Sequence, residues 1–247
     1  MALKTTLNYS ANFSSIKRRK KQIKFIIFHY TGMKKESSAI NKLTNIQSEV
    51  SSHYFIKKNG EVITLVPDLY IAWHAGKSSW KKYKSINKYS IGIEIANPGH
   101  KFNYRKFSKK QIKSLLRLSK FLIKRYNIKQ KNILGHSDIA PDRKKDPGEK
   151  FPWKYLAKNK VSLWHTLTDQ VLKKNRLFKV NKTEKKCFLN NLFKIGYSKK
   201  GSKNLNKEKY LEVIIKAFQR RYRQDLINGK IDKECLLICQ NLLKKLH

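Results

Sequence analysis

Acidic residues are scarce in this sequence, since 16 Asp and Glu stand against 57 Lys and Arg, a formal net charge of +41 at pH 7. Such a positive excess raises the possibility of a nucleic-acid-binding protein. However, lysines spread from Lys4 to Lys245 and outnumber arginines, whereas base and phosphate recognition favours clustered arginine with aromatic residues on one face. The sequence has no zinc finger, RNP-like aromatic motif or Gly-rich phosphate loop. We therefore expect no specific nucleic-acid partner and attribute the charge to a compositional bias towards Lys, Asn and Ile.

Cysteine is also scarce. Cys187, Cys235 and Cys239 are an odd number without regular spacing, which excludes a disulfide framework. Cys235 and Cys239 lie four residues apart in a predicted helix, and we interpret them as small apolar residues on a buried face rather than as a bridge or metal site.

Long apolar segments are missing too. No run approaches the ~20 residues that span a bilayer, and the start, MALKTTLNYS, lacks the apolar stretch of a secretory signal. We expect either a cytoplasmic protein or one whose signal is removed before this chain begins. With 40% hydrophobic and 11% aromatic residues, the chain is expected to fold into one large domain or a medium domain with a small one.

Four segments have the pattern of β-strands. IKFIIFHY at 23–30 is a nearly continuous apolar run, which is typical of a strand buried on both faces. HYFIKK and EVITLV flank Asn59-Gly60, a pair that favours a tight hairpin turn. In SIGIEIA at 90–96 the isoleucines share one face, so Glu94 points to the opposite face.

Helices are predicted between and after these strands. SAINKLTNIQ at 38–47 is one, and residues 108–126 are a longer one that starts with a capping box of Ser108 and Gln111. Strands that alternate with helices and are interrupted by a hairpin indicate an α/β fold, with a mixed sheet and packed helices.

The character of the sequence changes after residue 160. A short helical piece is predicted around Leu163 to Leu172, and Gly196, Gly201 and Gly229 separate the helices that follow. A bundle this small is marginal alone, so we expect it to dock on the first domain or on a ligand. The predicted organisation is an extended arm at 1–22, a main domain at 23–160, a linker at 161–183, and a domain at 184–247 with helices at about 184–195, 208–223 and 232–246.

Side chains suited to chemistry concentrate in the main domain. They are His29 at the end of one strand, Glu94 on another, and His136, Lys144 and Asp146 in the loop GHSDIAPDRKKDPG. Two imidazoles and one carboxylate form a catalytic zinc set that leaves the fourth tetrahedral position for water. From spacing alone, a structural role for a strand-end histidine stays open. A serine nucleophile is disfavoured because the sequence has no G-x-S-x-G elbow.

Five motifs carry a resemblance to a known family. Together they resemble the zinc-dependent N-acetylmuramoyl-L-alanine amidases of the AmpD and AmiD branch. The resemblance implies the amidase and peptidoglycan-recognition fold, one Zn2+ per chain, and hydrolysis of the amide bond between N-acetylmuramic acid, or its anhydro form, and L-alanine in peptidoglycan or muropeptides. The motifs cover about residues 23–157 and are FHYT at 28–31, SSHYFI at 51–56, AWHAG at 72–76, SIGIEIANPG at 90–99 and GHSDIAPDRKKDPGEKFPW at 135–153.

The resemblance also implies roles for individual residues. The zinc ligands would be His29, His136 and Asp146. Glu94 would be the catalytic carboxylate that moves a proton from water to the leaving amine, and Lys144 would stabilise the oxyanion. An ordinary exposed strand carboxylate is the alternative for Glu94.

Four further residues are candidates for substrate binding. Trp73 and His74 of AWHAG are expected either to line the cleft or to pack in the core, and His53 could line the cleft, orient a ligand or fill the core. Arg143 is a candidate partner for a stem-peptide carboxylate, because a guanidinium binds carboxylates as a fork. Its alternative is one more surface charge.

The C-terminal segment EVIIKAFQRRYRQDLINGKIDKECLLICQNLL resembles a peptidoglycan-binding helical domain, although that family usually has Thr at the position of Cys235. The resemblance implies that the helices hold the enzyme on its polymer. A chain ending near Lys182 is then expected to cleave small muropeptides and to lose activity on insoluble wall. The same domain favours the cell envelope (periplasm) or secretion over the cytoplasm. Two other functions stay open: a catalytically inactive peptidoglycan-recognition module and a basic nucleic-acid-binding protein.

Overall fold

A six-stranded mixed sheet forms the centre of the computed structural model, which describes residues 5–201 and 205–246. Neighbouring strands are parallel except for β4 and β5. The predicted α/β fold with a mixed sheet is therefore confirmed. Because β3, β9 and β10 are parallel, their carboxyl ends meet at one edge, where open α/β sheets form ligand crevices. The strand order is β1 (Thr6–Leu7), β5 (Val62–Thr64), β4 (Tyr54–Ile56), β9 (Ser90–Ile95), β3 (Phe25–Tyr30) and β10 (Ile133–Gly135).

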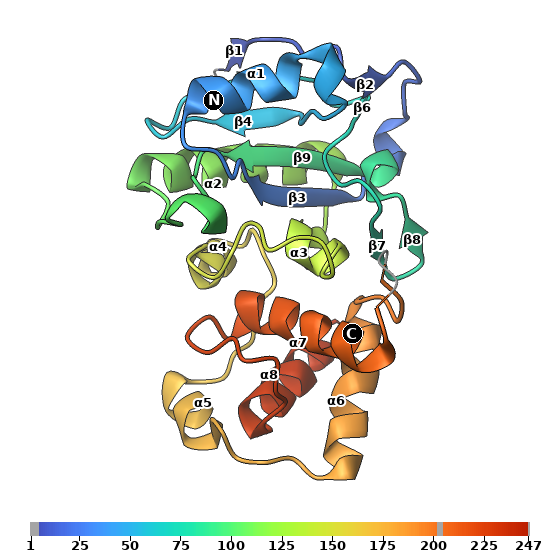
Figure 1. The fold of residues 1–247 in the computed structure, drawn as a ribbon, viewed down its shortest axis with the longest axis vertical. Coiled ribbons are helices and arrows are strands. Elements are labelled where there is room, and N and C mark those ends of the chain that lie inside the picture. Colours follow the sequence, from blue (N-terminus) through green and yellow to red (C-terminus); the bar gives the residue numbers. More distant parts are fainter. Residues whose placement is uncertain (1–4, 202–204, 247) are drawn as a thin grey trace.

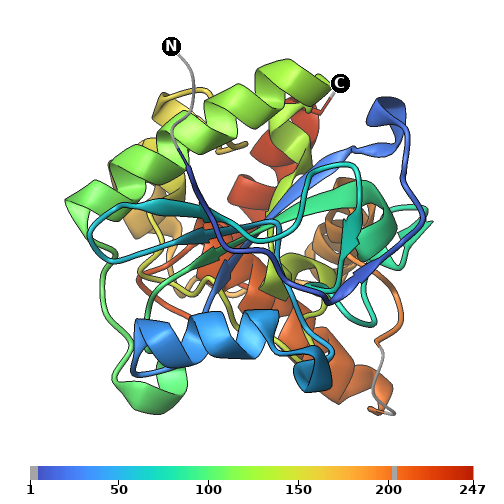
Figure 2. The ribbon, with the colours of Figure 1, turned by 90° about the horizontal axis from the view of Figure 1, so that it is seen from above.

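Helices cover both faces of this sheet, with α2 (Lys109–Tyr126) on one side and α1 (Glu36–Thr44) on the other (Figure 2). The isoleucines of β9 pack in one buried cluster with Leu115, Leu118 and Leu122 of α2. The other face carries the alternate residues of the same strands, as the period of two requires. The capping box predicted for α2 is present, since the Ser108 side chain accepts from Gln111 N–H and the Gln111 side chain accepts from Ser108 N–H.

The predicted hairpin is also present, as antiparallel β4 and β5. Gly60 in its turn has a φ of +88°, and a Cβ there would lie 2.8 Å from the carbonyl oxygen of Lys110. Both the left-handed backbone and the close approach of α2 therefore require glycine at this position.

The N-terminal segment differs from the predicted arm. Its residues 1–4 lie outside the described residues, and the rest is extended but packed against the domain. β1 adds to the edge of the sheet beside β5, and β2 (Phe13–Ser14) pairs antiparallel with β6 (Ile71–Ala72). The buried Asn12 amide donates to the carbonyls of Asn45 and Val50 at 2.8 and 2.9 Å. Such pairing depends on distant partners, which a local polar pattern does not indicate.

The C-terminal helices gather beyond the β3 and β10 end of the sheet, below α3 (His136–Ile139) and α4 (Trp153–Lys158) (Figure 1). The three helices predicted after residue 184 are present as α6 (Lys182–Ile195), α7 (Lys207–Tyr222) and α8 (Lys233–Lys244). The helical piece predicted around Leu163 to Leu172 lies later, as α5 (Asp169–Asn175).

One buried apolar cluster runs from β3 into these helices. It joins Phe25 and Ile27 of the sheet, through Leu134, to Phe188 and Phe218 of α6 and α7. The bundle therefore docks on the first domain, while the exact domain boundaries stay a prediction. Cys235 and Cys239 are buried and not disulfide-bonded, as predicted. No helix within residues 5–201 and 205–246 is long and apolar enough to cross a membrane.

The remaining elements are short. They are β7 (Ser79–Trp80), β8 (Tyr83–Lys84), η1 (Lys20–Gln22), η2 (Ile46–Ser48), η3 (Ile86–Tyr89), η4 (His100–Phe102) and η5 (Gln130–Asn132).

Candidate metal centre and active site

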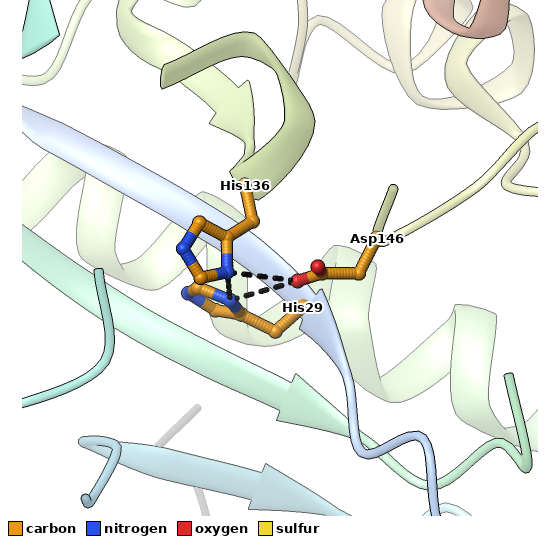
Figure 3. Close-up of side chains that lie close together, drawn as sticks. All are labelled: His29, His136 and Asp146. Atoms are coloured by element: carbon orange, nitrogen blue, oxygen red, sulfur yellow. Dashed lines mark hydrogen bonds and ion pairs between the residues drawn. The ribbon is translucent and has the colours of Figure 1, made fainter. Parts of the chain in front are cut away.

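Three predicted ligands converge at the carboxyl edge of the sheet (Figure 3). His29 lies near the end of β3, His136 is the first residue of α3, directly after β10, and Asp146 follows in the next loop. The two imidazole Nδ1 atoms are 2.9 Å apart, and Asp146 Oδ2 lies 3.0 Å from Nδ1 of His29 and 3.1 Å from Nδ1 of His136. All three side chains are buried. They form the group within the described residues that could hold a metal ion.

The local backbone explains how the loop reaches the strand. Ser137 N–H donates to the Asp146 carbonyl at 2.9 Å, which ties the two ends of the loop together. A Cβ on Gly135 would lie 2.6 Å from Pro147 Cδ. Glycine before His136 therefore allows the Asp146–Pro147 segment to pass against the end of β10.

Electrostatics favour the protonation states that a metal requires. Burial, assisted by the nearby His136, lowers the pKa of His29 to about 4. Burial opposes ionisation of Asp146, but the two adjacent imidazoles outweigh it and hold the pKa of this carboxyl well below its usual range. Neutral imidazole and ionised carboxylate are the forms that bind metal. The cluster thus fits a divalent cation in composition, spacing and protonation.

Glu94 lies beside the cluster. It is directly opposite His29 in the β3–β9 register, so both side chains extend from the same face of the sheet. It is not the exposed strand carboxylate of the alternative interpretation, because its Oε2 atom is buried and has no hydrogen-bond partner among the described residues. Burial, together with the negative charge of Asp146, raises the pKa of Glu94 to about 8.

A cavity of about 600 Å³ opens above these side chains. Lys144 and Trp73, which the sequence placed in the site, both line it, and Trp73 is 36% exposed. Lys144, Glu94 and Trp73 therefore line one space beside the ligand cluster. This set can bind an anionic or carbonyl oxygen, move a proton and pack against an apolar or sugar surface.

The AWHAG segment, residues 72–76, lies next to the histidine ligands. His74 lines the cavity but is largely buried, and its Nδ1 lies 3.0 Å from Nε2 of His29. Burial keeps the pKa of His74 well below its usual range. Arg143 also lines the cavity, where its Nη2 donates to the carbonyls of Ala75, at 3.1 Å, and Lys77. The guanidinium predicted to bind substrate is thus partly engaged with the protein backbone.

His53, the other histidine considered for substrate binding, does not line the cavity. Its side chain is fully buried. Nδ1 accepts from Gly92 N–H at 3.0 Å, and Nε2 lies 3.1 Å from the Tyr70 carbonyl. Both ring nitrogens are therefore used inside the fold, which is the core role that the sequence had left open.

Two residues near the site escaped the sequence analysis. Asn87 Oδ1 accepts from the backbone N–H groups of His74 and Ala75, at 3.2 and 2.7 Å. A Cβ on Gly92 would lie 2.4 Å from Cγ of His74, so the ring occupies the space that a side chain would fill. The glycine inside the strand motif SIGIEIA was an available signal, because glycine in a strand often marks a close approach.

Comparisons with known proteins agree with this geometry. Residues 19–149 match the family model described as N-acetylmuramoyl-L-alanine amidase. The chain is 34% identical to AmiD of Escherichia coli over 236 residues, which cover 91% of this chain and 83% of AmiD. It is 39% identical to the 1,6-anhydro-N-acetylmuramyl-L-alanine amidase AmpD of the same species over 104 residues, 42% of this chain and 55% of AmpD.

Two solved structures extend the similarity to the whole fold. E. coli AmiD in complex with anhydro-N-acetylmuramic acid-L-Ala-D-gamma-Glu-L-Lys superimposes with a TM-score of 0.79, over 94% of this chain and 92% of that one. AmpDh3 of Pseudomonas aeruginosa, in complex with an anhydromuramic pentapeptide, gives a TM-score of 0.78 at 28% identity, over 98% of both chains.

Proposed function

This chain belongs to the N-acetylmuramoyl-L-alanine amidase family and hydrolyses the amide bond between N-acetylmuramic acid, or its anhydro form, and L-alanine, and we propose that it does so with one zinc ion. The observation that carries the proposal is the convergence of two imidazole Nδ1 atoms and one carboxylate oxygen within 3.1 Å of each other. His29, His136 and Asp146 would hold the ion. Two histidines and one carboxylate are a ligand set typical of catalytic zinc.

When bound, zinc would supply a Lewis acid that lowers the pKa of a water molecule and polarises the scissile carbonyl. Side chains of the protein carry out the proton transfer and stabilise the developing negative charge. Glu94 accepts a proton from the attacking water at its unpaired carboxylate oxygen and delivers it to the leaving nitrogen of L-alanine. Its environment supports this role, because a carboxyl group with a pKa raised to about 8 can both hold and release a proton near neutral pH.

Lys144 stabilises negative charge on the lactyl carbonyl oxygen. Lys144 lines the same cavity as Glu94, and fixed charge is most effective where the oxygen becomes anionic in the transition state. Trp73 packs against the sugar or the peptide, and the lysine-rich rim, with Lys42, Lys101 and Lys145, attracts the free carboxylates of the stem peptide.

The substrate is peptidoglycan or a muropeptide released from it. The bound anhydromuramyl peptides of the two solved relatives support a soluble fragment, and the helical bundle supports polymer. We propose that the protein acts in the cell envelope or outside the cell, because a bundle that binds polymer would be of use where intact wall is present. The presence of a proton carrier at Glu94 and of all three ligands weighs against an inactive recognition module.

Metal analysis together with mass spectrometry of digested muropeptides tests the proposal. The purified protein should contain about one zinc per chain and release L-Ala peptides from muropeptides. His136→Ala should lose the zinc and all measurable turnover, because two remaining ligands do not hold a catalytic ion. Full zinc retention in this variant, or products cut at another bond, would overturn the proposal.

A further inference from the structure

The outer nitrogens of the two histidine ligands are both bound by one short segment. Nε2 of His29 lies 3.0 Å from Nδ1 of His74, and Nε2 of His136 lies 3.2 Å from the carbonyl oxygen of Ala75. His29 and His136 are 107 positions apart in the sequence, yet consecutive residues of AWHAG contact both. A carbonyl oxygen only accepts, so His136 carries its hydrogen on Nε2 and presents a lone pair on Nδ1.

The hydrogen position on His29 follows from a longer chain. Ser90 Oγ donates to the Ile86 carbonyl at 2.8 Å, which uses the only hydrogen of this hydroxyl. It must then accept from Nε2 of His74, 3.0 Å away. A neutral imidazole has a single N–H, so Nδ1 of His74 accepts from Nε2 of His29. The lone pair of His29 is therefore on Nδ1, the atom that faces Asp146.

The segment itself is held rigidly. Its two backbone N–H groups share the Asn87 side-chain oxygen, and the His74 ring lies in the space that Gly92 leaves open. Arg143 also donates to the Ala75 carbonyl. Such outer hydrogen bonds set the orientation and tautomer of metal-binding histidines.

We propose that His74, Ala75 and Ser90 form a positioning device that fixes both histidines with their Nδ1 lone pairs towards the metal, before the metal arrives. The proposal rests on the zinc site described above. The Ser90 hydroxyl sets the donor-to-acceptor direction of this chain of hydrogen bonds, because that direction can reverse when the hydroxyl is absent. In the reversed state Nδ1 of His29 carries the hydrogen and donates it to Asp146, and zinc must displace that hydrogen in order to bind.

Ser90→Ala in the full-length chain tests this directly, with Ser119→Ala as its matched control. Ser119 is also fully buried, but its hydroxyl has no hydrogen-bond partner among the described residues and lies on α2. Zinc affinity, measured by competition with a chelator, should fall about 10- to 100-fold in Ser90→Ala and stay within about 3-fold in Ser119→Ala. At saturating zinc, Ser90→Ala should lose much less turnover than zinc affinity, because the bound ion fixes the tautomer. A purely structural defect would lower both quantities.

Nitrogen NMR of the zinc-free protein gives a second readout. Long-range ¹⁵N–¹H correlation spectra should show the His29 hydrogen on Nε2 in the parent and a population on Nδ1 in Ser90→Ala. At position 74, Asn can still accept through its side-chain oxygen whereas Leu cannot, so His74→Asn should bind zinc at least 10-fold more tightly than His74→Leu. If Ser90→Ala binds zinc as tightly as Ser119→Ala, and His74→Asn as tightly as His74→Leu, this inference is overturned while the metal site stands. A parent protein that binds no zinc would overturn the metal site as well.

Discussion

The loop that carries His136 and Asp146 lies between the cavity and the helical bundle. The carboxyl groups on its two sides differ in how many hydrogen bonds they make. On the cavity side, Glu94 keeps a buried oxygen without a partner among the described residues. On the bundle side, the Asp138 carboxylate is well paired. It accepts hydrogen bonds from Gly135 N–H at 2.8 Å, from Tyr197 OH at 2.7 Å and from Arg221 at 2.5 Å. The open oxygen of Glu94 thus lies on the cavity side, whereas the paired carboxylate of Asp138 holds the loop in place.

Arg221 shows how deeply the bundle enters this arrangement. It extends from α7, is buried, donates a second hydrogen bond to the Ile133 carbonyl at 2.9 Å, and stacks over the Trp153 ring at 4.3 Å. Its partner Asp138 is two residues from the ligand His136. The bundle therefore supports the ligand loop, whatever contribution it makes on polymer. Substitutions on the bundle side should accordingly lower stability, and substitutions on the cavity side should lower the catalytic rate.

The largest effect is expected from removing the bundle altogether. A chain that ends at Lys182 exposes the apolar cluster that joins Phe25 and Ile27 to the helices and leaves the charge of Asp138 without its guanidinium. We expect loss of zinc and of nearly all activity on soluble muropeptide and insoluble wall alike, in contrast to the selective loss that the sequence predicts. Unimpaired cleavage of the soluble substrate, with a normal melting temperature, would show that the two regions are independent.

On the cavity side, Glu94→Gln should lower turnover by about 10²- to 10⁴-fold, because the amide has the shape of the carboxyl group but cannot carry the proton. Zinc content and melting temperature should not fall, since burial of this group already disfavours its charge. Glu208→Gln is the control, as Glu208 is an exposed carboxylate on α7. Kinetics at saturating zinc check the result, and turnover within a few fold of the parent would remove Glu94 from the reaction.

These two regions were not equally accessible from the sequence. Local patterns mark the ligands and Glu94 as candidates, since His29 and Glu94 lie on apolar strands and His136 lies in a loop stiffened by proline, and the family resemblance implies their roles. Helices α6, α7 and α8 likewise follow from periodicity and glycine positions. Local signals of this kind survive folding because each element buries the face that its pattern marks.

Long-range pairing was not predictable in the same way. The basic run of the AFQRRY helix gives no sign that Arg221 is buried, because its burial depends on Asp138, 83 positions away. The hydrogen bonds of β1 with β5 and the inward orientation of His53 also depend on partners distant in the sequence. Periodicity records which face of an element is apolar but not which charged side chain finds a buried partner.

Arg221→Met in the full-length chain should sharpen the comparison from the bundle side. It leaves a buried carboxylate without its cation, which costs about 3 kcal/mol of unfolding free energy. Lys216→Met on the same helix removes a surface pair with Glu212 and should cost far less, because solvent screens an exposed pair. Asp138→Asn combined with Arg221→Met should recover part of the loss. Urea unfolding measures all three, and equal costs for the buried and the surface pair would contradict the assignment.

The smallest effect is expected at the junction itself, where His165 packs on Trp164, which in turn contacts Tyr222 of α7. Burial, with a contribution from Lys154, lowers the pKa of His165 to about 4, against about 6.5 in an unfolded chain. The unfolded chain therefore takes up a proton as the pH falls through 6.5, while the folded protein does not until about pH 4. The stability contributed by the neutral ring is complete above pH 6.5 and is lost progressively below it, by about 1 kcal/mol between pH 7.5 and 5.5.

His165→Phe keeps the aromatic packing and removes the titration, so its unfolding free energy should fall less over this interval than that of the parent by that amount. The other buried histidines titrate in both proteins and cancel in the difference. Identical slopes for the two proteins would show that His165 is already solvated in the folded state and that the junction is looser than its packing indicates.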